Sequence, residues 1–203
     1  MNWEKKVWVV DDLIPEESQE AIKQKLLGDR FPWFYVPDVT SQEAEIKRPG
    51  LNHSFVFDGK FNPEEEKYHG NMLQYLWKNG LNKLKEKTNS IAKYSIIKSR
   101  AFLQVPLRGV NGGEYDSHHI DVDFKHIVFL YYVCDSDGDT VIFENMYSPE
   151  KNKRPELNEL TEKVRVTPKK GRLVIFDGFY WNNGTQQTKN NRCVINTNIE
   201  IIS

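Results

Sequence analysis

The sequence predicts a fold that is mainly β with flanking helices, a double-stranded β-helix or jelly roll, and three observations support this prediction. From about residue 92, at least six short β-branched and aromatic runs are separated by turn-rich stretches. The first half carries two helical patterns. Helices do not alternate with strands in the second half, as they would along a parallel sheet. The strand-rich half is therefore expected to form antiparallel sheets that the helices cover.

Length and charge limit the classes of protein that fit. The 203 residues, 38% of them hydrophobic, suffice for one well-filled core, so we expect a single domain over residues 1–203. The 28 basic and 29 acidic residues nearly balance, and no long block of one sign predicts a nucleic-acid or membrane partner. The chain lacks a run of about 20 apolar residues and a recognisable secretory signal. We therefore expect a cytoplasmic protein, in which Cys134 and Cys193 are reduced core thiols.

The first elements are a short strand at 7–12 (VWVVDD) and a helix that begins at Pro15 and runs to about Leu27. Two glutamates in the first turn of this helix suit the positive end of its dipole. Ile22 and Leu26 are expected on its buried face.

An aromatic and proline-rich segment, residues 28–61, separates this helix from a longer one. We expect irregular structure there with a short strand or two, and we expect FPWFY at 31–35 to lie in the core. The clearest helix covers residues 63–87, because apolar residues recur at three- and four-residue spacings. These residues are Leu73, Leu76, Trp77, Leu81 and Leu84.

The remaining strands follow in close succession. Turn-rich stretches such as RGVNGGEYD, DSDGD and NNGTQQTKNN separate them. The expected strand segments are AKYSIIKSRAFLQV, HIVFLYYV, DTVIFE, EKVRVTP, RLVIFD and RCVINTNIEII. The sequence contains no P-loop, GxGxxG or GxSxG motif, so nucleotide-binding and serine-hydrolase functions lack support.

The segment SHHIDVD, residues 117–123, carries the most chemistry. In an extended chain, residues two apart point to the same side, so His119 and Asp121 project together while His118 and Ile120 face the other way. An imidazole and a carboxylate so placed can occupy neighbouring positions on one metal. The alternative is a solvated turn capped by Asp121, because three-residue patterns are common.

The order of motifs after this pair extends the pattern: a strand, a glycine-containing turn with the strand DGDTVIFE, a strand ending in FDG, and RCVIN. With this order the chain resembles the small bacterial and phage type of prolyl 4-hydroxylase-like Fe(II)/2-oxoglutarate-dependent dioxygenases. The resemblance covers nearly the whole chain, beginning with VWVVDDLIPEE and FPWFY, and its specific part is residues 115–196. It implies a cupin-like jelly roll with Fe(II) and 2-oxoglutarate as cofactors.

The resemblance also implies roles for individual residues. His119 and Asp121 match the first two metal ligands of the family's triad of two histidines and one carboxylate. Arg192 matches the basic residue that binds the distal carboxylate of 2-oxoglutarate, for which a planar guanidinium is well suited. Tyr132 matches a strand tyrosine that donates a hydrogen bond to the same carboxylate, and a role as a core aromatic is the alternative.

The second histidine of the family pattern FDGxxxH is replaced here, because the matching segment FDGFYWNNGT places Asn182 at that position. Three accounts are open. Iron binds through His119, Asp121 and the weaker donor Asn182; another histidine takes the place; or catalysis is lost and the fold kept. The remaining histidines are expected in ordinary surface or core positions; they are His53, His69, His118 and His126.

Two functions compete on this evidence. The first is an oxygenase that hydroxylates a C–H bond of a peptidyl proline, an amino acid or another small substrate, so that the partner is a small molecule or a peptide. Residues 31–61 and 145–160 would then select the substrate, and residues 179–181 (FYW) would line the mouth of the site. The alternative is a catalytically impaired or inactive jelly-roll binding module of the same family.

Overall fold

The computed structural model describes residues 3–39, 48–89, 93–107, 111–150 and 153–202. These residues form two α-helices, one short 3-10 helix and eleven strands. In chain order the elements are β1 Val7–Val10, α1 Glu16–Leu27, β2 Phe34–Val36, β3 Gly50–Phe57, β4 Lys60–Phe61, α2 Pro63–Thr88, β5 Lys93–Gln104, β6 Ile127–Tyr132, β7 Thr140–Met146, η1 Leu157–Glu159, β8 Glu162–Val166, β9 Leu173–Asp177, β10 Tyr180–Gly184 and β11 Arg192–Ile202.

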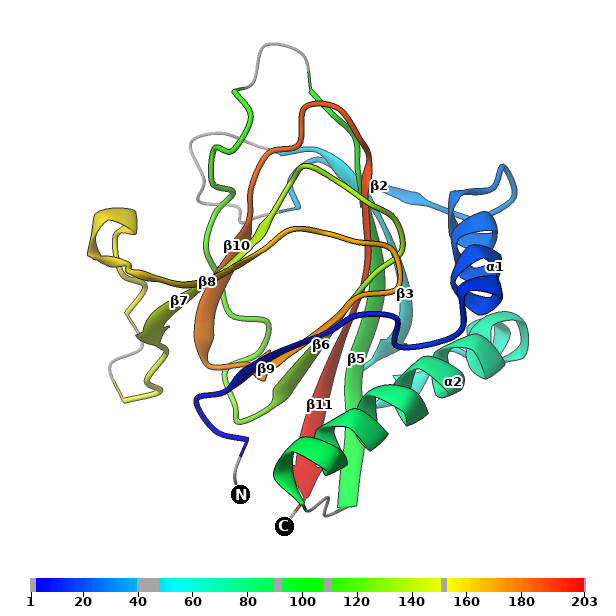
Figure 1. Ribbon diagram of the computed structural model, residues 1–203, viewed down its shortest axis with the longest axis horizontal. Helices are drawn as coiled ribbons and strands as arrows, with labels where there is room; N and C mark the ends of the chain where they lie inside the picture. Colours follow the sequence, from blue (N-terminus) through cyan, green and yellow to red (C-terminus); the bar gives the residue numbers. More distant parts are fainter. Residues whose placement is uncertain (1–2, 40–47, 90–92, 108–110, 151–152, 203) are drawn as a thin grey trace.

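The strands build two antiparallel sheets. The large sheet has eight strands in the order β1-β9-β6-β11-β5-β3-β2, with β4 paired to β3. The small sheet has the order β10-β7-β8. In Figure 1 both helices lie on one side of the large sheet and the small sheet lies on the other side. The predicted mainly β jelly roll with flanking helices is therefore confirmed.

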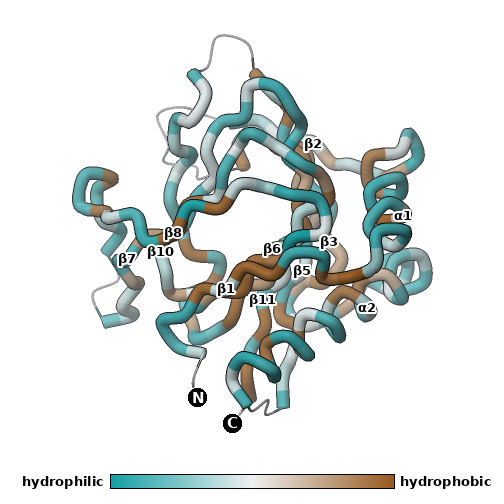
Figure 2. Tube along the Cα trace, viewed as in Figure 1, coloured by the Kyte–Doolittle hydropathy of each residue, from teal (hydrophilic) through white to brown (hydrophobic). Residues whose placement is uncertain are grey.

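The central strands of the large sheet divide their side chains between two cores. On β6, Ile127, Phe129 and Tyr131 pack in the core that contains the helices. The intervening residues Val128 and Leu130 pack against the small sheet. Strands β9 and β11 alternate in the same way, because successive side chains point to opposite faces. Figure 2 shows the hydrophobic residues concentrated along these central strands.

Helix α2 has clear signals at both ends. The side chain of Asn62 accepts the backbone N–H of Glu64 over 3.1 Å, and Pro63 occupies the first turn. The helix ends at Asn89, which adopts a left-handed conformation with φ 56° and donates its backbone N–H to Lys85. All five residues of the predicted apolar stripe are buried. The expected helix over 63–87 is thus confirmed.

Several expectations need adjustment. Segment 31–35 is only partly core, because Phe31 is buried whereas Phe34 and Tyr35 are 60% and 70% exposed on the edge strand β2. The last three residues of β10 fall in the stretch NNGTQQTKNN that we expected to be turn-rich, and pairing with β7 makes them part of a strand. Both cysteines are buried and unpaired, as expected. Within the described residues, the helices are too short or too polar to cross a membrane.

Candidate active site

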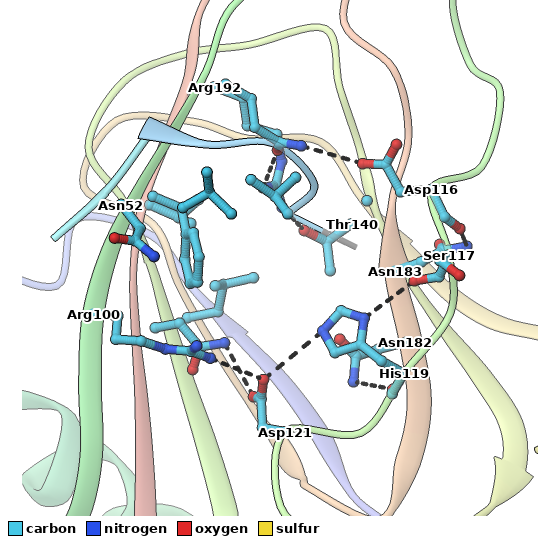
Figure 3. Close-up of a pocket in the computed structure, with 18 of the residues that line it drawn as sticks. Asn52, Arg100, Asp116, Ser117, His119, Asp121, Thr140, Asn182, Asn183 and Arg192 are labelled. Atoms are coloured by element: carbon cyan, nitrogen blue, oxygen red, sulfur yellow. Dashed lines mark hydrogen bonds and ion pairs between the residues drawn. The ribbon is translucent and has the colours of Figure 1, made fainter. Parts of the chain in front are cut away.

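A cavity of about 340 Å³ lies between the inner face of the large sheet and β10 of the small sheet. Its apolar wall consists of Phe102, Leu130, Phe176 and Val194. Figure 3 shows His119, Asp121 and Asn182 at one end of this cavity and Arg192 with Thr140 at the other. The cavity therefore places two different polar clusters on opposite sides of an apolar wall.

The first cluster centres on His119 and Asp121, which the sequence predicted to project together. Nε2 of His119 lies 3.8 Å from Oδ1 of Asp121. Nδ1 of His119 donates to the carbonyl of Ser117 over 3.2 Å, which leaves the lone pair on Nε2. The backbones of His119 and Asn182 form an antiparallel bridge that fixes this segment against β10.

The carboxylate of Asp121 is held by the large sheet. Its Oδ2 accepts hydrogen bonds from the Nδ2 atoms of Asn196 (3.0 Å) and Asn198 (2.8 Å) on β11. Nη2 of Arg100 on β5 lies 3.8 Å from Oδ1. Burial alone would raise the pKa of Asp121, but His119, Arg100 and the two asparagines lower it below its ordinary value. Asp121 therefore stays ionised, with Oδ1 directed toward His119.

Asn182 lies beside the imidazole of His119 (Figure 3), so the structure places it next to the predicted ligand pair. Its Nδ2 donates to the backbone carbonyls of His119 and Tyr180, each over 3.2 Å. Because the amide nitrogen is engaged in this way, the oxygen is the atom that remains for a metal. An amide oxygen is a neutral donor and replaces an imidazole only weakly.

The second cluster centres on Arg192 at the start of β11. Its guanidinium donates from Nε to the carbonyl of Gly138 (3.1 Å), from Nη1 to Gln104 (3.3 Å) and from Nη2 to Oγ1 of Thr140 (2.7 Å). A guanidinium has five N–H groups, so one N–H on each Nη atom remains. This pair suits a carboxylate bound through both oxygens.

Tyr132 lies behind this cluster rather than in the cavity wall. It is fully buried, and its hydroxyl donates to Oγ1 of Thr140 over 2.7 Å. Burial is the largest influence on its pKa and raises it. The structure therefore places Tyr132 in the core, where its hydroxyl contacts the cavity residue Thr140.

Other aromatic and histidine residues lie away from the cavity. Phe179, Tyr180 and Trp181 do not line it, so the expectation that they form its mouth is wrong. Tyr180 belongs to the core between the sheets, and Trp181 packs with Val141 and Phe143. The alternation along β10 explains the position of Trp181, because neighbouring residues of a strand face opposite sides and Asn182 faces the cavity.

None of the remaining histidines takes the place of the missing ligand. His118 faces Trp181, with ring centroids 5.5 Å apart, and His126 packs beside Phe179. His53 and His69 lie on the helix-covered side of the large sheet, around Phe55. The account in which another histidine reaches this site therefore finds no support in the described residues.

Sequence reasoning missed four residues that shape the site: Arg100, Thr140, Asn196 and Asn198. A signal for two of them was present in RCVINTNIEII, where asparagines two residues apart interrupt an apolar strand on the face that carries Arg192. Arg100 shares a face of β5 with the cavity residues Lys98 and Gln104 in the same way. Alternation alone does not show what such polar residues contact.

Neither a protein family model nor a curated relative matches the chain. Solved structures do match. A 2OG-Fe(II) oxygenase family oxidoreductase from Burkholderia pseudomallei is 12% identical, with TM-score 0.66, covering 96% of this chain and 84% of that one. The viral collagen prolyl hydroxylase of Paramecium Bursaria Chlorella virus-1, in a 2OG complex, is 15% identical, with TM-score 0.58 and coverages of 97% and 96%.

A Pseudomonas putida prolyl-4-hydroxylase is also similar, at 13% identity and TM-score 0.55, and the match covers 97% of this chain and 93% of that one. With TM-scores above 0.5 at such low sequence identities, these matches show a common fold and no more. The chain therefore has the fold of the 2OG-Fe(II) oxygenases.

Proposed function

We propose that this protein is a 2-oxoglutarate-dependent iron(II) oxygenase related to prolyl 4-hydroxylases, which hydroxylates a C–H bond of a peptidyl proline, an amino acid or another small substrate. One observation carries the proposal. Two metal-type donors, Nε2 of His119 and Oδ1 of Asp121, converge at one end of a cavity whose other end presents the free N–H pair of Arg192. The fold shared with prolyl hydroxylases supports the same conclusion.

The donors fit iron(II) in chemical type. An imidazole lone pair and an ionised carboxylate oxygen are two members of the triad that binds iron in such oxygenases. Nδ1–H of His119 is held by a backbone carbonyl, which is the usual support for a metal-bound histidine. Asn182 offers an oxygen next to His119, so the third protein donor is weaker than in a complete triad.

The second cluster fits the far carboxylate of 2-oxoglutarate. Arg192 would bind it with one N–H from each Nη atom. Both acceptor positions of Thr140 Oγ1 are occupied, by Tyr132 and by Arg192, so the hydroxyl proton of Thr140 is free to donate into the cavity. When bound, iron and 2-oxoglutarate would supply the activation of oxygen. The protein would orient both groups, and the apolar wall of the cavity would exclude water.

The substrate class follows from similar proteins alone. Two of the matched structures are prolyl hydroxylases, which favours a proline-containing peptide over a free amino acid. The rim of the cavity includes Val36 on β2 and Asn52 on β3, both in the predicted substrate-selecting region 31–61. A substrate that enters the cavity from this side would contact these two residues.

A second candidate function is a binding module without turnover, and Asn182 favours it. The amide of Asn182 is tied to two backbone carbonyls, as expected for a residue that stabilises the strand. In this alternative the cavity retains an oxoacid or a related dicarboxylate through Arg192, while iron binds weakly.

Anaerobic titration with Fe(II) and 2-oxoglutarate distinguishes the two candidates. For the oxygenase we expect a metal-to-ligand charge-transfer absorption, followed by succinate formation in air. His119→Ala should abolish both signals, whereas the matched control His118→Gln should keep them, because that imidazole faces Trp181. If the unmodified protein shows neither signal but binds 2-oxoglutarate without iron, the binding module is the correct function.

Asn182→His supplies a second test. The substitution completes a triad of two histidines and one carboxylate, so the affinity for iron(II) should rise by at least about tenfold. Asn182→Ala should lower it. An unchanged affinity in both variants would show that this side chain has no part in metal binding.

A further inference from the structure

We propose that His53, Glu65 and His69 form a second divalent-metal site, of the zinc type, on the helix-covered side of the large sheet. Oε2 of Glu65 lies 2.6 Å from Nε2 of His53 and 3.4 Å from Nε2 of His69. One donor atom of each residue lies within 4.8 Å of the other two. The set of two imidazoles and one carboxylate is complete here, unlike in the cavity.

The fold brings the three residues together from rigid elements. Glu65 and His69 are four residues apart on α2, so they share one face of the helix. His53 lies on β3 and faces that helix, whereas its neighbour Asn52 faces the cavity. The two candidate metal sites are therefore on opposite faces of the same sheet.

The hydrogen bonds of His53 leave Nε2 as the metal-facing atom. Its Nδ1 lies 2.7 Å from the carbonyl of Pro32, and because a carbonyl only accepts, Nδ1 must donate. A backbone carbonyl on the far nitrogen is the usual support of a metal-bound imidazole. The 2.6 Å contact between Nε2 and Glu65 then holds a shared proton, which a metal would displace.

Aromatic rings surround the two histidines of the cluster. The rings of Phe31 and Phe55 pack against both histidines, and Phe34 stacks on His53. Both imidazoles are themselves buried, with 1% of His53 and 8% of His69 exposed. Within the described residues, Nδ1 of His69 has no hydrogen-bond partner.

The distance between the donor atoms of Glu65 and His69 agrees with zinc. Two ligands at about 2.1 Å from Zn²⁺ with tetrahedral angles lie about 3.4 Å apart, which is the separation of Glu65 and His69. The shorter contact to His53 would lengthen when the metal replaces the proton. Bound zinc would connect α2 to β3 and to the Pro32 carbonyl, so its expected role is to stabilise the packing of helix on sheet.

The test uses the full chain carrying His119→Ala and Asp121→Ala, which removes the donors of the cavity. After chelator treatment, this protein should bind about one equivalent of Zn²⁺ by calorimetry. Co²⁺ should give the intense visible absorption of a tetrahedral site. Zn²⁺ should also raise the thermal unfolding midpoint.

Adding Glu65→Gln to this protein should weaken zinc binding by at least about 100-fold. His69→Gln should do the same, whereas Glu66→Gln, on the next residue of the helix, should not. Circular dichroism verifies that each variant is folded. If His69→Gln unfolds, the comparison of Glu65→Gln with Glu66→Gln alone tests the proposal. The proposal is overturned if the protein with His119→Ala and Asp121→Ala binds no zinc. It is also overturned if adding Glu65→Gln leaves zinc binding as tight as in the Glu66→Gln control.

Discussion

The hydroxyl of Tyr132 donates a 2.7 Å hydrogen bond to Oγ1 of Thr140, so the polar group of the tyrosine acts on the cavity through the threonine. Nη2 of Arg192 donates to the same oxygen over 2.7 Å. These two donors orient the Thr140 hydroxyl. We therefore expect a ligand carboxylate at this end of the cavity to contact Arg192 and Thr140 rather than Tyr132.

Substitutions of Thr140 and Tyr132 should have unequal effects on 2-oxoglutarate binding. Thr140→Val removes a donor to a carboxylate, which costs about 1.5 kcal/mol and weakens binding roughly tenfold. Tyr132→Phe leaves the donor in place and should change the dissociation constant only a few-fold. Calorimetric titration of the metal-loaded proteins measures both. An equal or larger effect of Tyr132→Phe would mean that the tyrosine contacts the ligand directly.

Arg192→Lys should weaken 2-oxoglutarate binding although the charge is kept. Lysine cannot present two parallel N–H groups, and the lost charge-assisted hydrogen bond corresponds to about 1.5–3 kcal/mol, or roughly a 10- to 100-fold larger dissociation constant. The control is Arg172→Lys, since Arg172 pairs with Asp11 outside the cavity. If both variants bind alike, Arg192 is not the carboxylate-binding residue.

Helix α2 packs so closely on β6 that Gly80 should not tolerate a methyl group. A Cβ at Gly80 would lie 2.5 Å from the ring of Phe129. The gain in helix propensity is about 1 kcal/mol, but overpacking costs about 1–3 kcal/mol, so Gly80→Ala should lower the free energy of unfolding. A Cβ at Gly70 in the same helix would contact only Cγ of Glu66, at 3.4 Å. Gly70→Ala should therefore raise the free energy of unfolding. Urea unfolding compares the two, and equal responses would contradict this packing.

His126 should make the protein less stable as the pH falls. Burial lowers the pKa of this imidazole, despite the opposing influence of Asp121 and Asp177. Below about pH 6.5 the imidazole of His126 binds a proton in the unfolded chain but not in the folded chain. The free energy of unfolding therefore decreases as the pH falls.

His126→Gln removes this titration and should reduce the loss of stability between about pH 7 and pH 5. Urea midpoints over a pH series measure the slope. The pKa of His118 is lowered as well, so part of the slope should persist in the variant. A slope identical to that of the unmodified protein would show that His126 takes up a proton as readily in the folded as in the unfolded chain.

Much of the fold could be predicted because the signals are local. The stripe from Leu73 to Leu84 follows the helical period, and HIVFLYYV needs only its β-branched and aromatic content to indicate a strand. Strand β10 could not be predicted in this way. Its polar residues Asn182 and Asn183 are poor strand formers. Their strand conformation depends on pairing with β7 and on the hydrogen bond that the Asn183 side chain donates to the carbonyl of Asp116.

By itself, the sequence determined that His119 and Asp121 project to one side, because alternation along an extended segment is a property of the chain over a few residues. The tertiary structure decided what surrounds them. The register of β11 against β5 sets Asn196 opposite Arg100, and both then reach Asp121. Asn196 lies 75 positions from Asp121, and its strand partner Arg100 is still further from it along the chain, so only the pairing of distant strands brings these residues together.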